Sequence, residues 1–75
     1  MIELESVLNV IENAGLIFDK GTFDPNKSFK DNGIDSLDVM NLFLAVEEAF
    51  HVKFTEDEAE AIDTANKLVA ALNQR

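Results

Sequence analysis

The chain has 75 residues, which is enough for one domain but leaves no room for a deep catalytic cavity, because a domain of this size buries only about 60% of its unfolded surface. Fifteen acidic and six basic residues give a net charge of −9. That charge disfavours binding to nucleic acid and to anionic membranes, and it favours partners with basic surfaces.

The chain contains no cysteine, so a disulfide framework and a zinc–thiolate site are excluded and any thiol chemistry must come from an attached group. The longest apolar stretch, residues 39–46, is interrupted by Asn41 and is too short to span a membrane, and no basic leader precedes the first predicted helix. We therefore expect a soluble, cytoplasmic, monomeric protein that forms a single domain over residues 1–75.

The first predicted helix covers residues 4–14, where apolar residues follow the i, i+3, i+4, i+7 pattern of an amphipathic helix. Gly15 stands where a left-handed residue would end it. Residues 16–35 then form a loop that is longer than most loops in compact domains. Because this loop contains large apolar residues, we expect it to pack over the core through Leu16, Ile17, Phe18, Phe23 and Phe29.

The second predicted helix covers residues 37–50. Asp35 and Asp38 have the spacing of a capping pair, which places Ser36 at the helix N-terminus. Unpaired N–H groups and the helix dipole favour a phosphate ester there, although a plain helix cap is the alternative role for Ser36. Catalysis by Ser36 is not expected, because the single histidine, His51, lies about 22 Å further along a continuous helix.

This second helix carries more apolar residues than one buried face needs, so two stripes are expected on it. The inward stripe consists of Val39, Leu42, Val46, Ala49 and Phe50. The other, which we call the outer stripe, consists of Leu37, Met40 and Leu44. Since carboxylates flank it, the outer stripe is predicted to be a docking surface; the alternative is that the long loop covers it.

A short third helix is expected to begin at Thr55, because residues 55–58 have the spacing of a capping box. This helix is expected to end before residues 63–64, where a new helix start is predicted. A fourth helix follows, with Ala65, Leu68, Val69 and Leu72 on one face. We therefore predict an all-α fold: a small, largely antiparallel four-helix bundle with a long loop between helices one and two and a short third helix.

Oxygen-bearing side chains recur from Asp24 onward, as in a calcium-binding loop. However, Phe29 occupies the sixth position, where a glycine is needed, and Asp35 occupies the twelfth in place of a glutamate. No specific metal site is therefore predicted, and weak divalent binding by the acidic second half of the chain stays open.

Residues 33–40 resemble the prosthetic-group site of the acyl carrier proteins, whose hallmark is an Asp-Ser-Leu triplet after a loop glycine; here the triplet is Asp35, Ser36 and Leu37. The resemblance covers essentially the whole chain, because the second, third and fourth predicted helices fall where a stand-alone carrier has them. It implies that a phosphopantetheinyl transferase attaches phosphopantetheine from coenzyme A to Ser36, with Asp35 and Leu37 beside it. The thiol of that arm would hold acyl groups as thioesters.

The resemblance also implies that enzymes with basic docking surfaces, which transfer, condense or activate acyl groups, recognise the second helix. The expected partner surface consists of Asp38, Met40, Asn41, Leu44, Glu47 and Glu48. The expected acyl pocket consists of Phe43, Val46, Phe50, Phe54 and Ile62.

Some positions depart from the usual fatty-acid carrier. Asn41 stands where those carriers commonly have a glutamate, and His51 and Lys53 fall in a stretch that is usually acidic. Phe43 and Phe54 are bulkier than the aliphatic residues common there, which predicts a shorter or differently shaped acyl channel. We therefore predict a non-enzymatic carrier in a specialised fatty-acid, lipid or polyketide-type pathway. The alternatives are an aminoacyl or peptidyl carrier and a small acidic helical adaptor without a prosthetic group.

Overall fold

The computed structural model describes residues 1–17 and 21–74, and in these residues the regular secondary structure is helical apart from one isolated antiparallel bridge between Ser28 and Thr64. The helices are α1 (Leu4–Asn13), α2 (Ser36–Phe50), α3 (Glu56–Ala61) and α4 (Ala65–Asn73). The predicted all-α fold with a long first loop and a short third helix is confirmed. No helix in the described ranges is long and apolar enough to cross a membrane.

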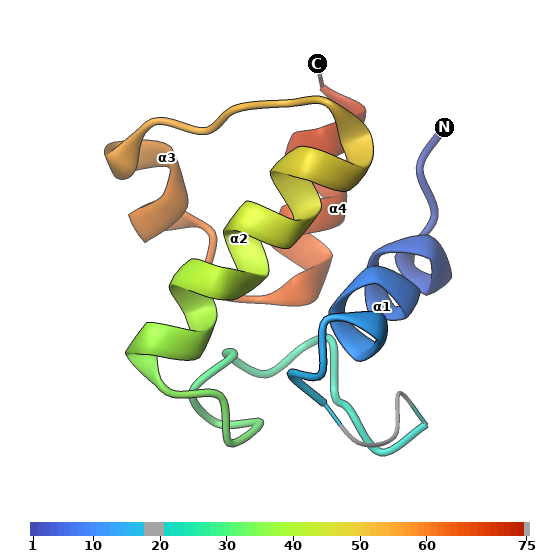
Figure 1. Cartoon of the computed structure of the whole chain (residues 1–75), viewed down its shortest axis with the longest axis vertical. Helices are drawn as coiled ribbons and strands as arrows, with labels where there is room; N and C mark the ends of the chain where they lie inside the picture. Colours follow the sequence, from blue (N-terminus) through green and yellow to red (C-terminus); the bar gives the residue numbers. More distant parts are fainter. Residues whose placement is uncertain (18–20, 75) are drawn as a thin grey trace.

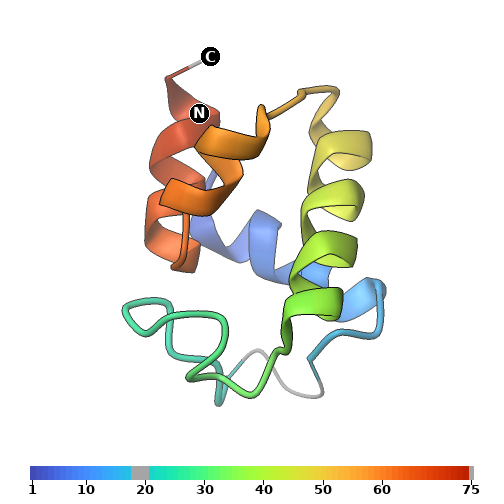
Figure 2. The same cartoon turned by 90° about the vertical axis from the view of Figure 1, so that its left-hand side faces the viewer.

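The helices are arranged so that α1 packs against both α2 and α4 (Figure 1). The short helix α3 lies on the opposite side of the molecule from α1, over the space between α2 and α4 (Figure 2). None of the residues of α3 is buried, although Ala59 packs partly buried against the core. α3 is therefore a cover held mainly by its two ends.

Three helices supply most of the core: Val7, Leu8 and Ile11 of α1, Leu42, Phe43 and Val46 of α2, and Ala65, Leu68 and Leu72 of α4. Phe23, Phe29, Ile34 and Ile62 from the connecting segments complete it. Ala49, which was predicted to face inward, is exposed, so this prediction is wrong. The buried face of α2 is instead centred closer to Phe43, whose ring packs against Phe29 and Phe54. Because each residue turns the helix by about 100°, that shift moves Ala49 to the edge of the face.

The ends of α1 and α2 both use a left-handed residue. After α1, Gly15 has φ +78, and the bonds from Gly15 N to Glu12 O and from Leu16 N to Ile11 O complete a Schellman motif, as the glycine predicted. After α2 the left-handed residue is His51, with φ 56. A residue other than glycine is strained in this conformation by roughly 1 kcal/mol, so the surrounding contacts must hold the turn in place.

The long loop packs over the core as predicted. Phe23, Phe29 and Ile34 are buried in it, and Leu16 and Ile17 are partly buried against the core. Phe18, which was expected to do the same, lies outside the described residues.

The side chain of Asn32 organises this loop. Its Oδ1 accepts a hydrogen bond from Asp24 N at 2.8 Å, and its Nδ2 donates to Asp24 O at 2.9 Å and to Ser28 O at 3.0 Å. The amide thus pairs with both backbone groups of Asp24, as a neighbouring strand would. The loop is also joined to the chain before α4, since Phe29 N donates to Asp63 O at 2.9 Å.

In the segment considered for calcium, the oxygens make bonds within the protein. Asp24 Oδ1 accepts from Asn26 N at 2.9 Å, and Asn26 Oδ1 accepts from Asn66 Nδ2 at 2.6 Å. Across residues 1–17 and 21–74 there is no group of three or more His, Cys, Asp or Glu side chains that could hold a metal ion.

We expect Asn32→Ala to lower the free energy of unfolding by about 2 to 3 kcal/mol, because it leaves partly buried backbone groups without partners. Asn13→Ala is the control, since Asn13 is exposed at the end of α1, and it should change stability by less than about 0.5 kcal/mol. Urea unfolding measures both. Equal stability of the two variants would show that the Asn32 bonds do not hold the loop.

Candidate functional site

Ser36 is the first residue of α2 and its side chain is exposed. The helix is capped by the residue before it: Asp35 has extended backbone angles, and its Oδ1 accepts a hydrogen bond from Asp38 N at 2.9 Å. The predicted capping role of Asp35 is confirmed. The helix cap is therefore Asp35 and not the Ser36 hydroxyl.

The turn before α2 fixes where Ser36 lies. Gly33 adopts φ +84, a conformation that favours glycine, and its N–H donates to Lys30 O at 2.9 Å. The next residue, Ile34, is buried, and its N–H donates to Phe29 O at 3.0 Å. Ser36 therefore follows two anchored residues rather than a free loop.

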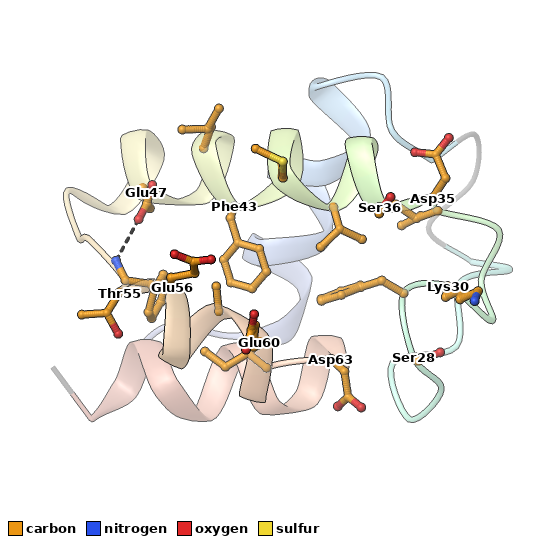
Figure 3. Close-up of a pocket in the computed structure, with 18 of the residues that line it drawn as sticks. Ser28, Lys30, Asp35, Ser36, Phe43, Glu47, Thr55, Glu56, Glu60 and Asp63 are labelled. Atoms are coloured by element: carbon orange, nitrogen blue, oxygen red, sulfur yellow. Dashed lines mark hydrogen bonds between the residues drawn. The ribbon is translucent and has the colours of Figure 1, made fainter.

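An open groove of about 1100 Å³ begins beside Ser36 and follows α2. Its second wall is formed by the loop around Phe29 and by α3. In Figure 3, Asp35 and Ser36 lie at one end of the groove, and Glu47 and Thr55 lie at the other. The groove can thus receive an extended group that is attached at Ser36.

The floor of the groove is largely aromatic. The rings of Phe29 and Phe43 meet edge to face at a centroid distance of 6.3 Å, and those of Phe43 and Phe54 meet at 5.7 Å and 82°. Phe23 extends the row, 6.4 Å from Phe29, beneath the loop. These packed rings form the floor beneath the open groove beside α2.

The residues predicted for an acyl pocket divide into two groups. Phe43, Phe54 and Ile62 line the groove, whereas Val46 is fully buried and neither it nor Phe50 lines the groove. Further apolar residues that were not predicted for the pocket also line the groove, namely Phe29, Ile34, Val39 and Ala59. The large apolar residues of the loop are evident in the sequence, but the path that brings Phe29 and Ile34 beside α2 is not.

The outer stripe is exposed: Leu37, Met40 and Leu44 are 70%, 67% and 60% accessible. The alternative that the long loop covers it is therefore wrong. Met40 and Leu44 also line the groove, while Leu37 does not. Around the stripe, Asn41 and Glu48 are exposed and Asp38 is partly exposed. At about 100° per residue, these residues lie on neighbouring faces of α2, from its first turn to its last.

Glu47, also predicted for this surface, is engaged within the protein. It is partly buried, and its Oε2 accepts a hydrogen bond from Phe54 N at 2.8 Å, which is the dashed line in Figure 3. The neighbouring segment is fixed as predicted by a complete capping box, in which Thr55 Oγ1 accepts from Glu58 N at 3.1 Å and Glu58 Oε1 accepts from Thr55 N at 2.9 Å.

Carboxylates from α3 and the segment after it line the groove opposite α2: Glu56, Glu60 and Asp63. The Lys67 ammonium, whose Nζ lies 2.8 Å from Asp63 Oδ1, lowers the pKa of the Asp63 carboxyl below its ordinary value of 3.8 by donating a hydrogen bond. The groove thus combines an apolar floor with three carboxylates on the side opposite α2.

Comparison with known families identifies what this arrangement is similar to. Residues 4–72 match the model of the family described as "Phosphopantetheine attachment site". The match begins at the first residue of α1, includes the long loop, Ser36 and α3, and ends at Leu72, one residue before the end of α4.

We expect Lys67→Met to return the pKa of Asp63 toward its ordinary value, because the hydrogen bond that lowers it is lost. A lowered folded pKa means that this pair stabilises the fold above pH 3.8 and that the stabilisation is lost as the pH falls through the lower folded value. An NMR titration of the Asp63 carboxyl carbon measures the shift. Lys27→Met should leave the titration unchanged, and an unchanged value in Lys67→Met would contradict the assignment.

Proposed function

The chain belongs to the phosphopantetheine attachment family, and we propose that the serine that carries the group is Ser36. Members of this family carry a covalently attached phosphopantetheine. The chain is therefore a carrier protein that works with a phosphopantetheinyl transferase and with partner enzymes. The pantetheine thiol supplies the sulfur that the cysteine-free sequence lacks.

The choice of Ser36 is supported by comparison with the other serines of the chain, Ser6 and Ser28. Ser28 is partly buried and its Oγ accepts a hydrogen bond from Asp31 N at 3.0 Å. Ser6 lies on α1, on the other side of the molecule from α3 (Figure 2), and is not among the residues that line the groove. Ser36 alone combines exposure, a helix N-terminus that favours a phosphodiester, and a groove that starts at the same residue.

The cargo we propose is an acyl group, held as a thioester on the arm and presented to enzymes of a specialised fatty-acid, lipid or polyketide-type pathway. The observation that carries this proposal is the apolar groove leading from Ser36, since a group tethered there can bury its chain against Phe43 and Val39. Each buried methylene contributes about 0.8 kcal/mol at most. A small aminoacyl group would gain much less from such a floor.

The chain itself performs no catalytic step in this proposal. The single histidine, His51, ends α2 and is not among the residues that line the groove, so it is not available as a base for Ser36. The transferase would bring the chemistry, and the carrier domain formed by residues 1–75 would supply the hydroxyl and the surface. Asp35 and Leu37 flank that hydroxyl, Asp35 as the helix cap and Leu37 as an exposed apolar contact.

We propose that partner enzymes dock on the outer stripe and on the polar residues beside it, Asp38, Asn41 and Glu48. Exposed side chains as large as Leu37, Met40 and Leu44 are the kind that a partner buries at the centre of an interface. Met40 suits a surface used by several partners, because its unbranched side chain adapts to different shapes. The surrounding carboxylates would guide partners with basic surfaces.

Loading of Ser36 is tested by intact mass after incubation with coenzyme A, magnesium and a broad-specificity transferase. We expect the wild type, Ser6→Ala and Ser28→Ala each to gain the mass of one phosphopantetheine. Ser36→Ala should keep its helical circular dichroism spectrum and gain nothing. A folded wild type that stays unmodified where a known carrier is loaded, or a Ser36→Ala variant that is modified, would falsify the proposal.

Docking is tested by the rate of loading at several salt concentrations. Met40→Asp should slow loading more than Asp38→Lys, because it places a charge at the apolar centre, whereas an exposed charge pair contributes only about 0 to 1 kcal/mol. The Asp38→Lys defect should shrink as salt rises. Glu3→Lys, an equal change of charge at the exposed start of α1, is the control. Wild-type rates for both α2 variants at every salt concentration would rule out this docking face.

A further inference from the structure

Glu47 is the residue around which the chain turns after α2. Its carbonyl oxygen accepts hydrogen bonds from His51 N and, at 3.1 Å, from Val52 N. Its carboxylate Oε2 accepts from Phe54 N at 2.8 Å. Backbone and side chain of one residue therefore bind three N–H groups of the segment that leads to α3.

The bond to Phe54 places an aromatic ring at the far end of the groove. Phe54 is partly buried and packs edge to face on Phe43, and both rings line the groove. The next residue, Thr55, is the N-cap of α3. Fixing the backbone of Phe54 therefore fixes both the ring and the start of the helix that forms the opposite wall.

The two ends of α3 are held by different contacts. The end nearer Ser36 is joined to the loop by the bond from Phe29 N to Asp63 O and by the bridge between Ser28 and Thr64. At the other end, the chain reaches α3 from the left-handed turn at His51. The contacts there include the hydrogen bond that Glu47 accepts from Phe54 N, the packing of the Phe54 ring on Phe43 and the partly buried Val52. Since no residue of α3 is fully buried, the Glu47 bond contributes to the position of the far end of the groove.

A role in docking alone would not distinguish Glu47 from Glu48. The two are neighbours with the same charge, but Glu48 is exposed, whereas Glu47 is partly buried and lines the groove. A charge-assisted hydrogen bond that a partly buried carboxylate accepts from a backbone N–H is also stronger than an exposed charge pair. The difference between these neighbours separates an internal role from a surface role.

We propose that Glu47 is a positioning residue that sets the length of the cargo: by holding Phe54 N it keeps the Phe54 ring as the end wall of the groove and restricts the carrier to short acyl groups. The proposal rests on the proposed function, in which a group attached through Ser36 lies in this groove. Without the bond, the segment around Phe54 can move away from α2, and the groove lengthens beyond the ring.

The test measures melting temperature against acyl length. Wild type, Glu47→Ala, Glu47→Gln and Glu48→Ala are each loaded with a series of straight-chain acyl-pantetheine groups, checked by mass, and compared with their own unacylated holo forms. For the wild type the melting temperature should rise with chain length and then level off at the end wall. In Glu47→Ala the plateau should move outward by about two carbons or more, since further methylenes can then be buried.

Two variants serve as matched controls. Glu47→Gln removes the charge but keeps an oxygen that accepts from Phe54 N, so its plateau should stay at the wild-type length. Glu48→Ala removes the same charge one residue away and should also keep the wild-type plateau. The melting temperature of the double variant Glu47→Ala/Phe54→Ala should level off at the same chain length as that of Phe54→Ala alone, because the two changes remove the same end wall.

Hydrogen exchange of the Phe54 amide gives a readout that needs no cargo. In Glu47→Ala the exchange should be about tenfold faster or more, as expected for loss of about 1.4 kcal/mol of local protection, and in Glu47→Gln and Glu48→Ala it should be close to wild type. A variant that is merely less stable would exchange faster throughout the core as well, and its plateau would not move.

The possible outcomes distinguish failure of this inference from failure of the proposed function on which it rests. If Glu47→Gln or Glu48→Ala shifts the plateau as Glu47→Ala does, charge and not the bond is responsible, and the inference is wrong. A wild-type plateau that no Glu47 variant moves also overturns it, with the groove still binding cargo. A flat profile in the wild type and in every variant would mean that cargo stays outside the groove. That result rejects this inference and the proposed burial of an acyl chain in the groove, whereas loading of Ser36 is judged by mass alone.

Discussion

The hydrogen bond from Phe29 N to Asp63 O joins the long loop to the segment before α4, and it links the loop and the α3 segment that together form the second wall of the groove. On one side of this bond, the buried Phe29 ring packs between Phe23 and Phe43 and the chain continues through Ile34 to Ser36. On the other side, Asp63 ends the segment that carries α3. A long loop is costly to order, and burial of such side chains, each contributing roughly 1.5 to 3 kcal/mol, offsets that cost.

The division of roles among the helices explains why a groove exists. Burial is concentrated in α1, α2 and α4, whose inward faces form one core. α3 is specified by its ends instead, through the capping box at Thr55 and the bonds made by Glu47 and Asp63. A helix that is fixed at its ends and does not bury its side chains can cover α2 without closing onto it, so the space beside Ser36 stays open.

The features that the sequence predicted correctly are those set by local spacing. Asp35, Thr55 and Gly15 mark helix ends through bonds to residues three to five positions away, and the surplus of apolar residues on α2 predicted the exposed outer stripe. Ala49 was misplaced because the direction of the buried face depends on where Phe43 finds its partners. Those partners, Phe29 and Phe54, come from outside the helix, and no periodicity within α2 reveals them.

Glu47 shows the same limit at the site. In the sequence, Glu47 next to Glu48 has the pattern of a solvated charge. Its bond to Phe54 N follows the left-handed turn at His51, and no glycine at that position predicts the turn. Met40 and Leu44, in turn, belong both to the outer stripe and to the lining of the groove. A partner on the stripe and a cargo in the groove would therefore contact the same two side chains. Their binding free energies are then coupled. By linkage, the factor by which cargo in the groove changes the affinity for a partner equals the factor by which the partner changes the occupancy of the groove by the cargo.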